Sequence, residues 1–436
     1  MSKAKLAKGA KVFNTARSTM NKVYLNDLPA ATNENIQTIS NILFNDSYKP
    51  MLNDFVQNLI NRIGLTIVRN KTFSNPLSIL RKGSMPLGTD IQDIYENPAV
   101  AEQYEISNSA MAKLLTITDP DTHVAYYRLN RKDKYTKSIT RENLQNAFVS
   151  WEKFENYITA ITTSLYSGNY IDEFKFTKSL VDGAYDNDKV IVEVIDDITD
   201  ETTAKKFVKK ARSLFNKMKL PSENFNAYSK FSGAKGKITT WTEDDRFILI
   251  VTSDVMAEVD VEVLARAFNI ENSKFLGRVI EVDSFENKEI KAILCDEAWF
   301  QIYENLMRFD EFYNANVMMW NEYLHVWQTY AICPFANAIV FATKEPVPAT
   351  SISFATDTVA LDLASTPTGE TLELTIAPSG ATSQIRYSSS DNDIFTVTKV
   401  AENKVTVIPK KVGSAILTAK SDNGLTDSVT VNVTQS

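Results

Sequence analysis

The sequence predicts an α+β protein that is followed by a separate, small β-sandwich. Its 436 residues are enough for two to four domains. Helical and strand patterns are mixed up to residue 345 and do not alternate regularly as they do in a βαβ fold. Pro346 and Pro348 then mark a change in composition, because the last 91 residues contain 27 Ser and Thr but only three of the 45 aromatic residues. We therefore place a domain boundary at this point.

The N-terminal segment is basic. Its positive charges all precede the first acidic residue, Asp27, and are Lys3, Lys5, Lys8, Lys11, Arg17 and Lys22. No apolar core of the signal-peptide type follows, and no stretch elsewhere approaches the roughly 18 apolar residues of a membrane span. We expect a soluble, untargeted protein with no membrane partner.

Residues 64–137 contain little that could form a core. Four prolines interrupt them, and their apolar residues follow no long helical stripe. The end of this region, from His123 to Thr140, is typical of two strands around a turn at residues 131–133. A segment this long with so little to bury takes its order from a neighbour.

A long helix is predicted over residues 141–167. Apolar residues from Leu144 to Leu165 follow helical spacing, Thr140 can cap the first turn, and Gly168 can end the helix. At 1.5 Å per residue such a helix would be about 40 Å long. We therefore expect it to act as a spine rather than as part of a compact core.

Further helices and strands are predicted after the spine. The helices cover residues 202–220 and 254–268, and the strands cover residues 190–195, 247–252, 278–282, 290–295 and 335–343. Beyond the boundary, short alternating runs such as residues 371–376 and 429–433 are separated by turn residues, which predicts the β-sandwich.

The composition and motifs argue against an enzyme. A net charge of -7 disfavours a protein whose whole surface binds nucleic acid. The two His and two Cys are too dispersed to indicate a zinc site or a nucleophilic triad. Neither a GxxxxGK phosphate-binding loop nor a GxGxxG motif is present. We expect no catalytic residue, no metal and no cofactor.

The strand-forming runs of the C-terminal part occur in a characteristic order. They cover residues 349–353, 371–378, 386–397, 405–407, 411–419 and 427–433. In this order they resemble the bacterial immunoglobulin-like group 2 domain. Tyr387 stands where family members commonly have Trp, and residues 402–404 replace a Gly. The resemblance implies an immunoglobulin-like β-sandwich over residues 347–436.

Another set of motifs is spread along residues 1–345. They are RIGLTIVR at 62–69, NPL at 75–77, KGSMPLG at 82–88, AFVSW at 147–151, LARAFN at 264–269 and HVWQ at 325–328. This region resembles the major capsid protein of the small podoviruses of the phi-twenty-nine group. That family has the Hong Kong 97-type capsid fold and also ends in an immunoglobulin-like module, so the pairing of domains agrees.

The resemblance implies the division of the capsid domain, residues 1–345. The expected parts are an N-terminal arm at 1–63, an extended loop at 64–137, a spine and peripheral domain at 138–187, an axial domain at 188–297 and a return to the peripheral domain at 298–345.

The implied function is structural. A major capsid protein forms the pentamers and hexamers of an icosahedral head around phage double-stranded DNA. Scaffolding protein and portal are the implied partners, assembly takes place in the cytoplasm of the host bacterium, and the C-terminal module decorates the outer surface. The alternatives are the shell protein of a bacterial encapsulating nanocompartment and, with less support because no export signal is present, a cell-surface adhesin.

Two groups of basic residues are candidate contacts under this interpretation. The first group would bind neighbouring subunits through acidic residues at 172–173 and 186–188, and consists of Lys71, Arg81, Lys82, Arg128, Arg131 and Lys132. The second is the basic N-terminus, which would face packaged DNA or an acidic scaffold. A solvated, frayed terminus explains these N-terminal charges equally well.

Overall fold

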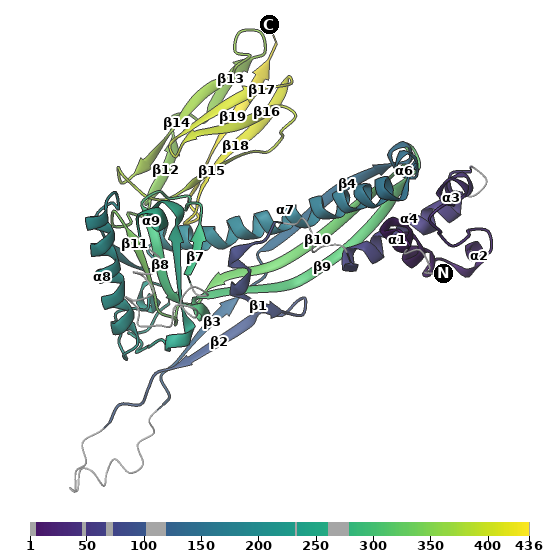
Figure 1. Cartoon of the computed structure of the whole chain (residues 1–436). Helices are drawn as coiled ribbons and strands as arrows, with labels where there is room; N and C mark the ends of the chain where they lie inside the picture. The colour runs from purple at the N-terminus through teal and green to yellow at the C-terminus, as the bar shows by residue number, and fades with distance from the viewer. Residues whose placement is uncertain are drawn as a thin grey trace. The chain divides into compact units, whose positions relative to one another are not determined.

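The computed structural model describes residues 6–45, 49–66, 73–101, 119–231, 233–259 and 279–435 (Figure 1). The chain divides into two compact units. The first consists of Met1–Ile91, Tyr127–Phe176 and Ile302–Tyr330, and the second of Gln92–Tyr126, Thr177–Gln301 and Ala331–Ser436. Each unit has hydrophobic cores of its own.

Short helices form the N-terminal part of the first unit. They are α1 (Lys8–Arg17), α2 (Lys22–Leu25), α3 (Ile36–Leu43) and α4 (Lys49–Thr66). The rings of Phe13 and Phe55 pack with their centroids 4.9 Å apart, and both rings contact Phe148. Trp151 and Phe154 belong to the same core. The segment expected as an arm therefore contains packed helices, and α1 is not a frayed terminus.

The spine is longer than the sequence predicted. It consists of α6 (Arg141–Ala147) and α7 (Trp151–Asp186), and the 36 residues of α7 correspond to about 54 Å. Thr140 caps α6 as predicted, since its side chain accepts a hydrogen bond from the Asn143 backbone. Gly168 lies inside α7, so the prediction that it ends the helix was wrong. The glycine has a packing role instead, because a Cβ at this position would lie 3.3 Å from the Tyr135 ring.

A four-stranded sheet packs against the spine in the first unit. Its order is β1 (Arg81–Ser84), β9 (Phe300–Asn314), β10 (Met319–Ile332) and β4 (Arg131–Thr140). Strands β10 and β4 are antiparallel, with Met319 opposite Thr140 and Gln328 opposite Arg131. Leu324 of β10 packs with Leu165 of α7. Strands β9 and β10 were not predicted from the sequence.

Strands β2 (Ile91–Glu96) and β3 (Thr122–Tyr127) form a separate two-stranded ribbon. Both strands predicted within residues 123–140 are present, but the predicted turn at 131–133 was wrong, because β3 pairs with β2 whereas β4 pairs with β10. Arg131 is the first residue of β4 and not a turn residue. Asn130 holds the start of β4 beside β10, because its side chain exchanges hydrogen bonds of 2.7 and 2.9 Å with the Tyr330 backbone.

The second unit contains a five-stranded sheet. Its order is β5 (Ile191–Val194), β11 (Ala338–Ala342), β8 (Ile290–Asp296), β6 (Phe247–Thr252) and β7 (Val279–Val282). Helix α8 (Glu201–Met218) packs on it through Phe207 and Phe215, and Asp200 caps the helix in a capping box. These strands and this helix confirm the predicted elements. Of the predicted helix at 254–268, the structure describes α9 (Ser253–Glu258), and residues 260–268 lie outside the described residues.

The C-terminal part consists of two four-stranded sheets that share an apolar core. The first is β12 (Ser351–Phe354), β14 (Glu370–Ala377), β17 (Lys404–Pro409) and β16 (Phe395–Ala401), and the second is β13 (Thr358–Asp362), β19 (Thr426–Thr434), β18 (Gly413–Ser421) and β15 (Ile385–Ser389). Phe395, Leu417 and Val431 lie in the shared core. Every strand predicted for this part is present, and β13, which pairs in parallel with β19, was not predicted.

Candidate functional site

Arg81 is engaged within its own chain. It begins β1, and its guanidinium makes a bidentate pair with the carboxylate of Glu173 on α7. The Glu173 side chain is only 1% exposed, and its hydrogen bonds raise the pKa of Arg81 above its ordinary value. The expected pairing of a loop cation with a spine carboxylate is therefore present, but inside one subunit.

Arg131 lies at the centre of a buried polar network. Its Nε donates to Asp133 at 2.6 Å, its Nη2 donates to Tyr135 at 2.7 Å and to Asn169 at 3.1 Å, and its Nη1 donates to Gln328. The residue is 4% exposed. The network lies inside the chain, where Arg131 joins β4 and β10 to the spine.

The other predicted loop cations are at the surface. The Arg128 side chain is 76% exposed and pairs with Asp90 at 2.8 Å. The Lys132 ammonium lies 5.0 Å from the centre of the Trp327 ring, and Lys82 is exposed on β1. Lys71 lies outside the described residues.

The basic N-terminal residues are not brought together at one point. Lys8, Lys11 and Lys22 are exposed on or beside the short helices. Arg17 instead donates to the backbone carbonyls of Leu28 at 2.6 Å and Leu25 at 2.8 Å, which holds the loop after α2. The remaining two predicted residues, Lys3 and Lys5, lie outside the described residues.

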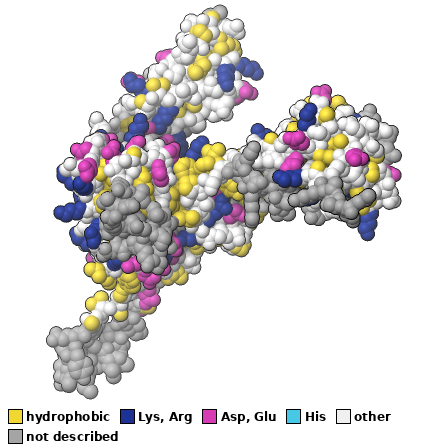
Figure 2. Space-filling view, viewed as in Figure 1, with side chains coloured by type: hydrophobic (Ala, Val, Ile, Leu, Met, Phe, Trp, Pro, Cys, Tyr) yellow, Lys and Arg dark blue, Asp and Glu magenta, His cyan; other side chains and the backbone are white. Residues whose placement is uncertain are grey.

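The β2–β3 ribbon exposes three large apolar side chains, which were not predicted as a contact surface from the sequence. Ile94, Val124 and Tyr126 are 59%, 42% and 60% exposed. In β3, the exposed Val124 and Tyr126 alternate with inward residues such as the buried His123. Figure 2 shows hydrophobic side chains on the surface of this ribbon. The alternation within 91–96 and 122–127 was the available signal, and exposed apolar residues gathered in this way mark a contact surface.

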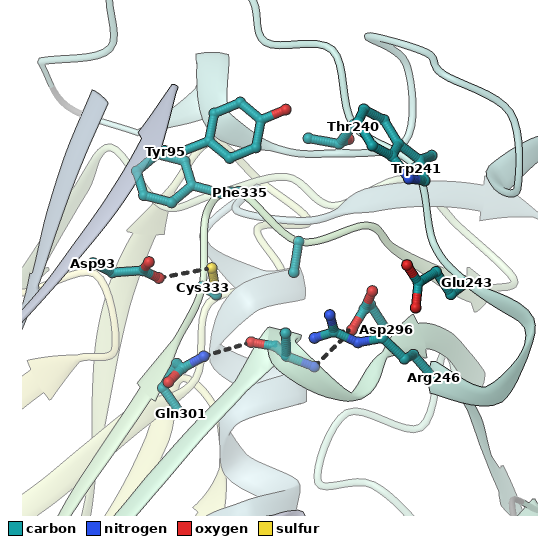
Figure 3. A pocket seen from close by; sticks show the side chains of 12 residues that line it. Asp93, Tyr95, Thr240, Trp241, Glu243, Arg246, Asp296, Gln301, Cys333 and Phe335 are labelled. Atoms are coloured by element: carbon teal, nitrogen blue, oxygen red, sulfur yellow. Dashed lines mark hydrogen bonds and ion pairs between the residues drawn. The ribbon is translucent and has the colours of Figure 1, made fainter. Parts of the chain in front are cut away.

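A cavity of about 380 Å³ lies in the second unit (Figure 3). Tyr95 and Phe335 form one wall, where their rings are stacked with centroids 5.6 Å apart. Trp241 lies across the cavity from them and is 49% exposed. The cavity therefore combines aromatic walls with access to solvent.

Charged groups complete the lining of the cavity. Arg246 pairs with the buried Asp296 at 3.2 Å. The thiol of Cys333 donates to Asp93 at 3.3 Å, and Glu243 lies at the rim. Burial raises the pKa of Asp296 above its ordinary value. The lining therefore combines an ion pair, a thiol–carboxylate hydrogen bond and an exposed carboxylate.

Buried carboxyl groups lie on the β9 and β10 strands. Glu322 is 0% exposed, and neither of its carboxyl oxygens has a hydrogen-bond partner. Burial raises the pKa of Glu322 to about 8 and that of Glu311 to about 7. The charge of Glu311 raises the pKa of Glu322 further, and the charge of Asp54 does the same for Glu311. Carboxyl groups in this environment are protonated more readily than in water.

The buried His123 has a structural contact. His123 bonds through Nδ1 to the Tyr228 hydroxyl at 2.9 Å. Across the ranges that the structure describes, no group of three or more His, Cys, Asp or Glu residues could hold a metal ion. Within the same ranges, none of the helices has both the length and the apolar character needed to cross a membrane.

Comparison with known proteins decides between the remaining interpretations. A family model described as the Phi29-like phage major capsid protein matches residues 13–342. The chain belongs to this family. The chain is similar to the major capsid protein of Bacillus phage PZA, with 34% identity over 342 residues, covering 78% of this chain and 73% of the relative. The major capsid protein of Bacillus phage B103 is 32% identical over 342 residues, covering 78% of this chain and 74% of the relative.

A solved structure shows the same fold. The capsid structure of Staphylococcus phage Andhra matches with a TM-score of 0.53 at 13% identity, covering 64% of this chain and 87% of the other. This confirms the predicted Hong Kong 97-type capsid fold. The Phi29-like family is a family of structural proteins of the virion capsid and is not a class of enzymes, in agreement with the sequence prediction.

Proposed function

We propose that copies of this chain assemble, as pentamers and hexamers, into the closed icosahedral head of a phage that encloses double-stranded DNA. The observation that carries the proposal is the family match over residues 13–342. Assembly in the host cytoplasm with a scaffolding protein and a portal is part of the same proposal. The division into arm (1–63), extended loop (64–137), peripheral (138–187 and 298–345) and axial (188–297) parts is also proposed.

The exposed apolar face of the β2–β3 ribbon supports self-association. Ile94, Val124 and Tyr126 are exposed in the isolated chain, and removing them from water against a second copy is favourable. A neighbouring subunit is the partner that a shell supplies to every copy of this surface.

The loop cations then divide into two classes. We assign intersubunit contacts to Lys82, Arg128, Lys132 and Lys71. Arg81 and Arg131 act inside the subunit, because the intrachain carboxylate of Glu173 and the buried network around Arg131 occupy them. Charge complementarity at the rim of an interface sets the register of neighbouring subunits.

The basic N-terminus is proposed to face the interior. Lys11 and Lys22 are exposed and their charges are available to a polyanion, with Lys3, Lys5 and Lys8, which lies 4.0 Å from Glu155, as further candidates. Either packaged DNA or an acidic scaffold supplies the required negative charge.

The C-terminal sheets are proposed to form an immunoglobulin-like domain of the bacterial group 2 kind on the outer surface of the head. Two features support this proposal. The eight strands have a core of their own, and the Tyr387 hydroxyl donates to the Glu402 backbone at 2.7 Å, which ties β15 to the loop after β16.

The two alternative functions receive less support. A nanocompartment shell protein would share the fold, and an adhesin would use the C-terminal domain. Neither explains why the family match covers residues 13–342 and names a phage capsid protein.

Co-expression of the full chain with the other head proteins of its phage tests the proposal. Sedimentation followed by negative-stain electron microscopy should reveal closed shells. A chain that stays monomeric under these conditions would refute the proposed function.

A further inference from the structure

We propose that the cavity of Figure 3 receives a lysine or arginine side chain from a second copy of this chain. The proposal rests on the proposed function, because the second copy is a neighbour in the shell. It adds the position and the chemistry of one contact.

The aromatic walls of the cavity suit a cation. Tyr95 is fixed by its stacking on Phe335 and by the hydrogen bond that its hydroxyl donates to the Thr239 carbonyl. Trp241 remains 49% exposed on the other side of the cavity. Lysine and arginine side chains are attracted to the faces of aromatic rings, most strongly to tryptophan.

The charges of the lining select a cation over an anion. Arg246 is paired with Asp296 at 3.2 Å, so these two charges largely offset each other. The carboxylate of Glu243 also lies on the lining. Glu243 is exposed and makes no ion pair with any described residue. A phosphate or carboxylate ligand would be repelled, whereas an ammonium or guanidinium group would gain both charge pairing and ring contacts.

The size of the cavity indicates a single side chain rather than a folded element. A volume of about 380 Å³ is at the lower end of the range for ligand sites. Exposed cations are present on the chain itself, for example Lys22 and Lys132. In a shell, every copy meets such cations at high local concentration.

Charge reversal at the rim provides the first test. Glu243→Lys should lower the fraction of subunits in shells about tenfold or more, because like charges would meet across the contact. Glu243→Gln should give a smaller loss, and its shells should be less sensitive to salt than wild-type shells. Asp245→Lys is the matched control, since Asp245 is exposed in the same turn but does not line the cavity. It should assemble like the wild type.

The outcomes separate the two proposals. Equal assembly of the Glu243→Lys, Glu243→Gln and wild-type chains would overturn the cavity proposal and leave the proposed function intact. A wild-type chain that forms no shells would refute the proposed function first. Thermal unfolding of the unassembled variants checks that each is folded. If the Glu243→Lys chain does not fold, the Glu243→Gln chain tests the contact by itself.

Photo-crosslinking identifies the occupant directly. Trp241 is replaced by benzoylphenylalanine in one isotopically labelled population, which is then assembled with unlabelled wild-type chain and irradiated. We expect a crosslink to an unlabelled peptide, at a site within a few residues of a Lys or Arg. Crosslinks confined to the same copy, to a segment without basic residues, or absent from closed shells would overturn the proposal.

Discussion

Glu322 is buried without a partner between the sheet and the spine of the first unit. The acids nearest to it are Glu311 on β9 and, beside Glu311, Asp54 on α4. Lys137 is opposite it in the β4 register, but its side chain is exposed. Glu322 therefore keeps its proton to higher pH than an exposed glutamate does.

This protonation predicts a stability that falls with rising pH. The pKa of Glu322 is about 8 in the folded chain against an ordinary value of 4.5. The folded state thus binds more protons between these two values, and stability is lost as pH rises through that window. Glu322→Gln should leave stability unchanged at pH 4 and increase it above pH 8 by roughly 1–4 kcal/mol. Urea unfolding at several pH values measures the difference.

The exposed Glu370→Gln variant is the control, and its curve should follow that of the wild type. Parallel pH curves for Glu322→Gln and wild type would show that Glu322 is ionised in the folded chain.

Arg131 and Arg128 provide a contrast between a buried and an exposed cation in the same stretch of chain. Arg131→Ala leaves Asp133 and Gln328 without their donor and should cost about 3–5 kcal/mol of unfolding free energy. Arg128→Ala should cost less than about 1 kcal/mol, because its pair with Asp90 is exposed. Chemical denaturation of the unassembled chains gives both values. Equal losses of unfolding free energy would contradict the assignment of Arg131 to the interior of the subunit and of Arg128 to its surface.

The α7 helix contains two glycines with opposite surroundings. A Cβ on Gly168 would lie 3.3 Å from the Tyr135 ring, whereas a Cβ on Gly183 meets nothing within 4 Å. Gly168→Val should therefore destabilise the chain by about 1–3 kcal/mol through overpacking. Gly183→Ala should stabilise it by about 0.5–1 kcal/mol through helix propensity. Melting temperatures of both variants test this, and a stabilising Gly168→Val would contradict the observed packing of the spine on β4.

Elements with a local signal were predictable from the sequence. Helix α8 was found because its buried residues repeat at helical spacing. Strands β9 and β10 were missed because polar residues occupy inward positions of the pattern, as Glu322 and Gln328 do in β10. The hydropathy pattern of a strand does not indicate which of its polar side chains point into the core.

The candidate site was predictable in residue type but not in pairing. The basic residues of the loop and the carboxylates of the spine were identified as partners. Arg81 and Glu173 are 92 positions apart, and their pairing within one chain depends on how β1 is placed beside the spine. The aromatic cavity likewise joins Tyr95, Trp241 and Phe335, which are distant in sequence.

The C-terminal sheets have apolar cores of their own. The buried residues of these cores begin at Ala349, beyond the boundary at Pro346 and Pro348. Truncation after Lys344 preserves the backbone carbonyl that accepts the Tyr185 hydroxyl at 2.7 Å. We expect the truncated chain to form shells whose diameter differs from that of the full-length shells by no more than the thickness of the missing domain. Electron microscopy of both preparations measures this, and complete loss of assembly would show that the domain is required for the shell.

Cryo-electron microscopy of assembled particles tests the central claim most directly. We expect a closed icosahedral shell in which Ile94, Val124 and Tyr126 of the β2–β3 ribbon, exposed in the single chain, are buried against a neighbouring copy. A particle reconstruction that leaves this face in solvent would contradict the proposed contact. Failure to find any closed particle when the other head proteins are present would contradict the function itself.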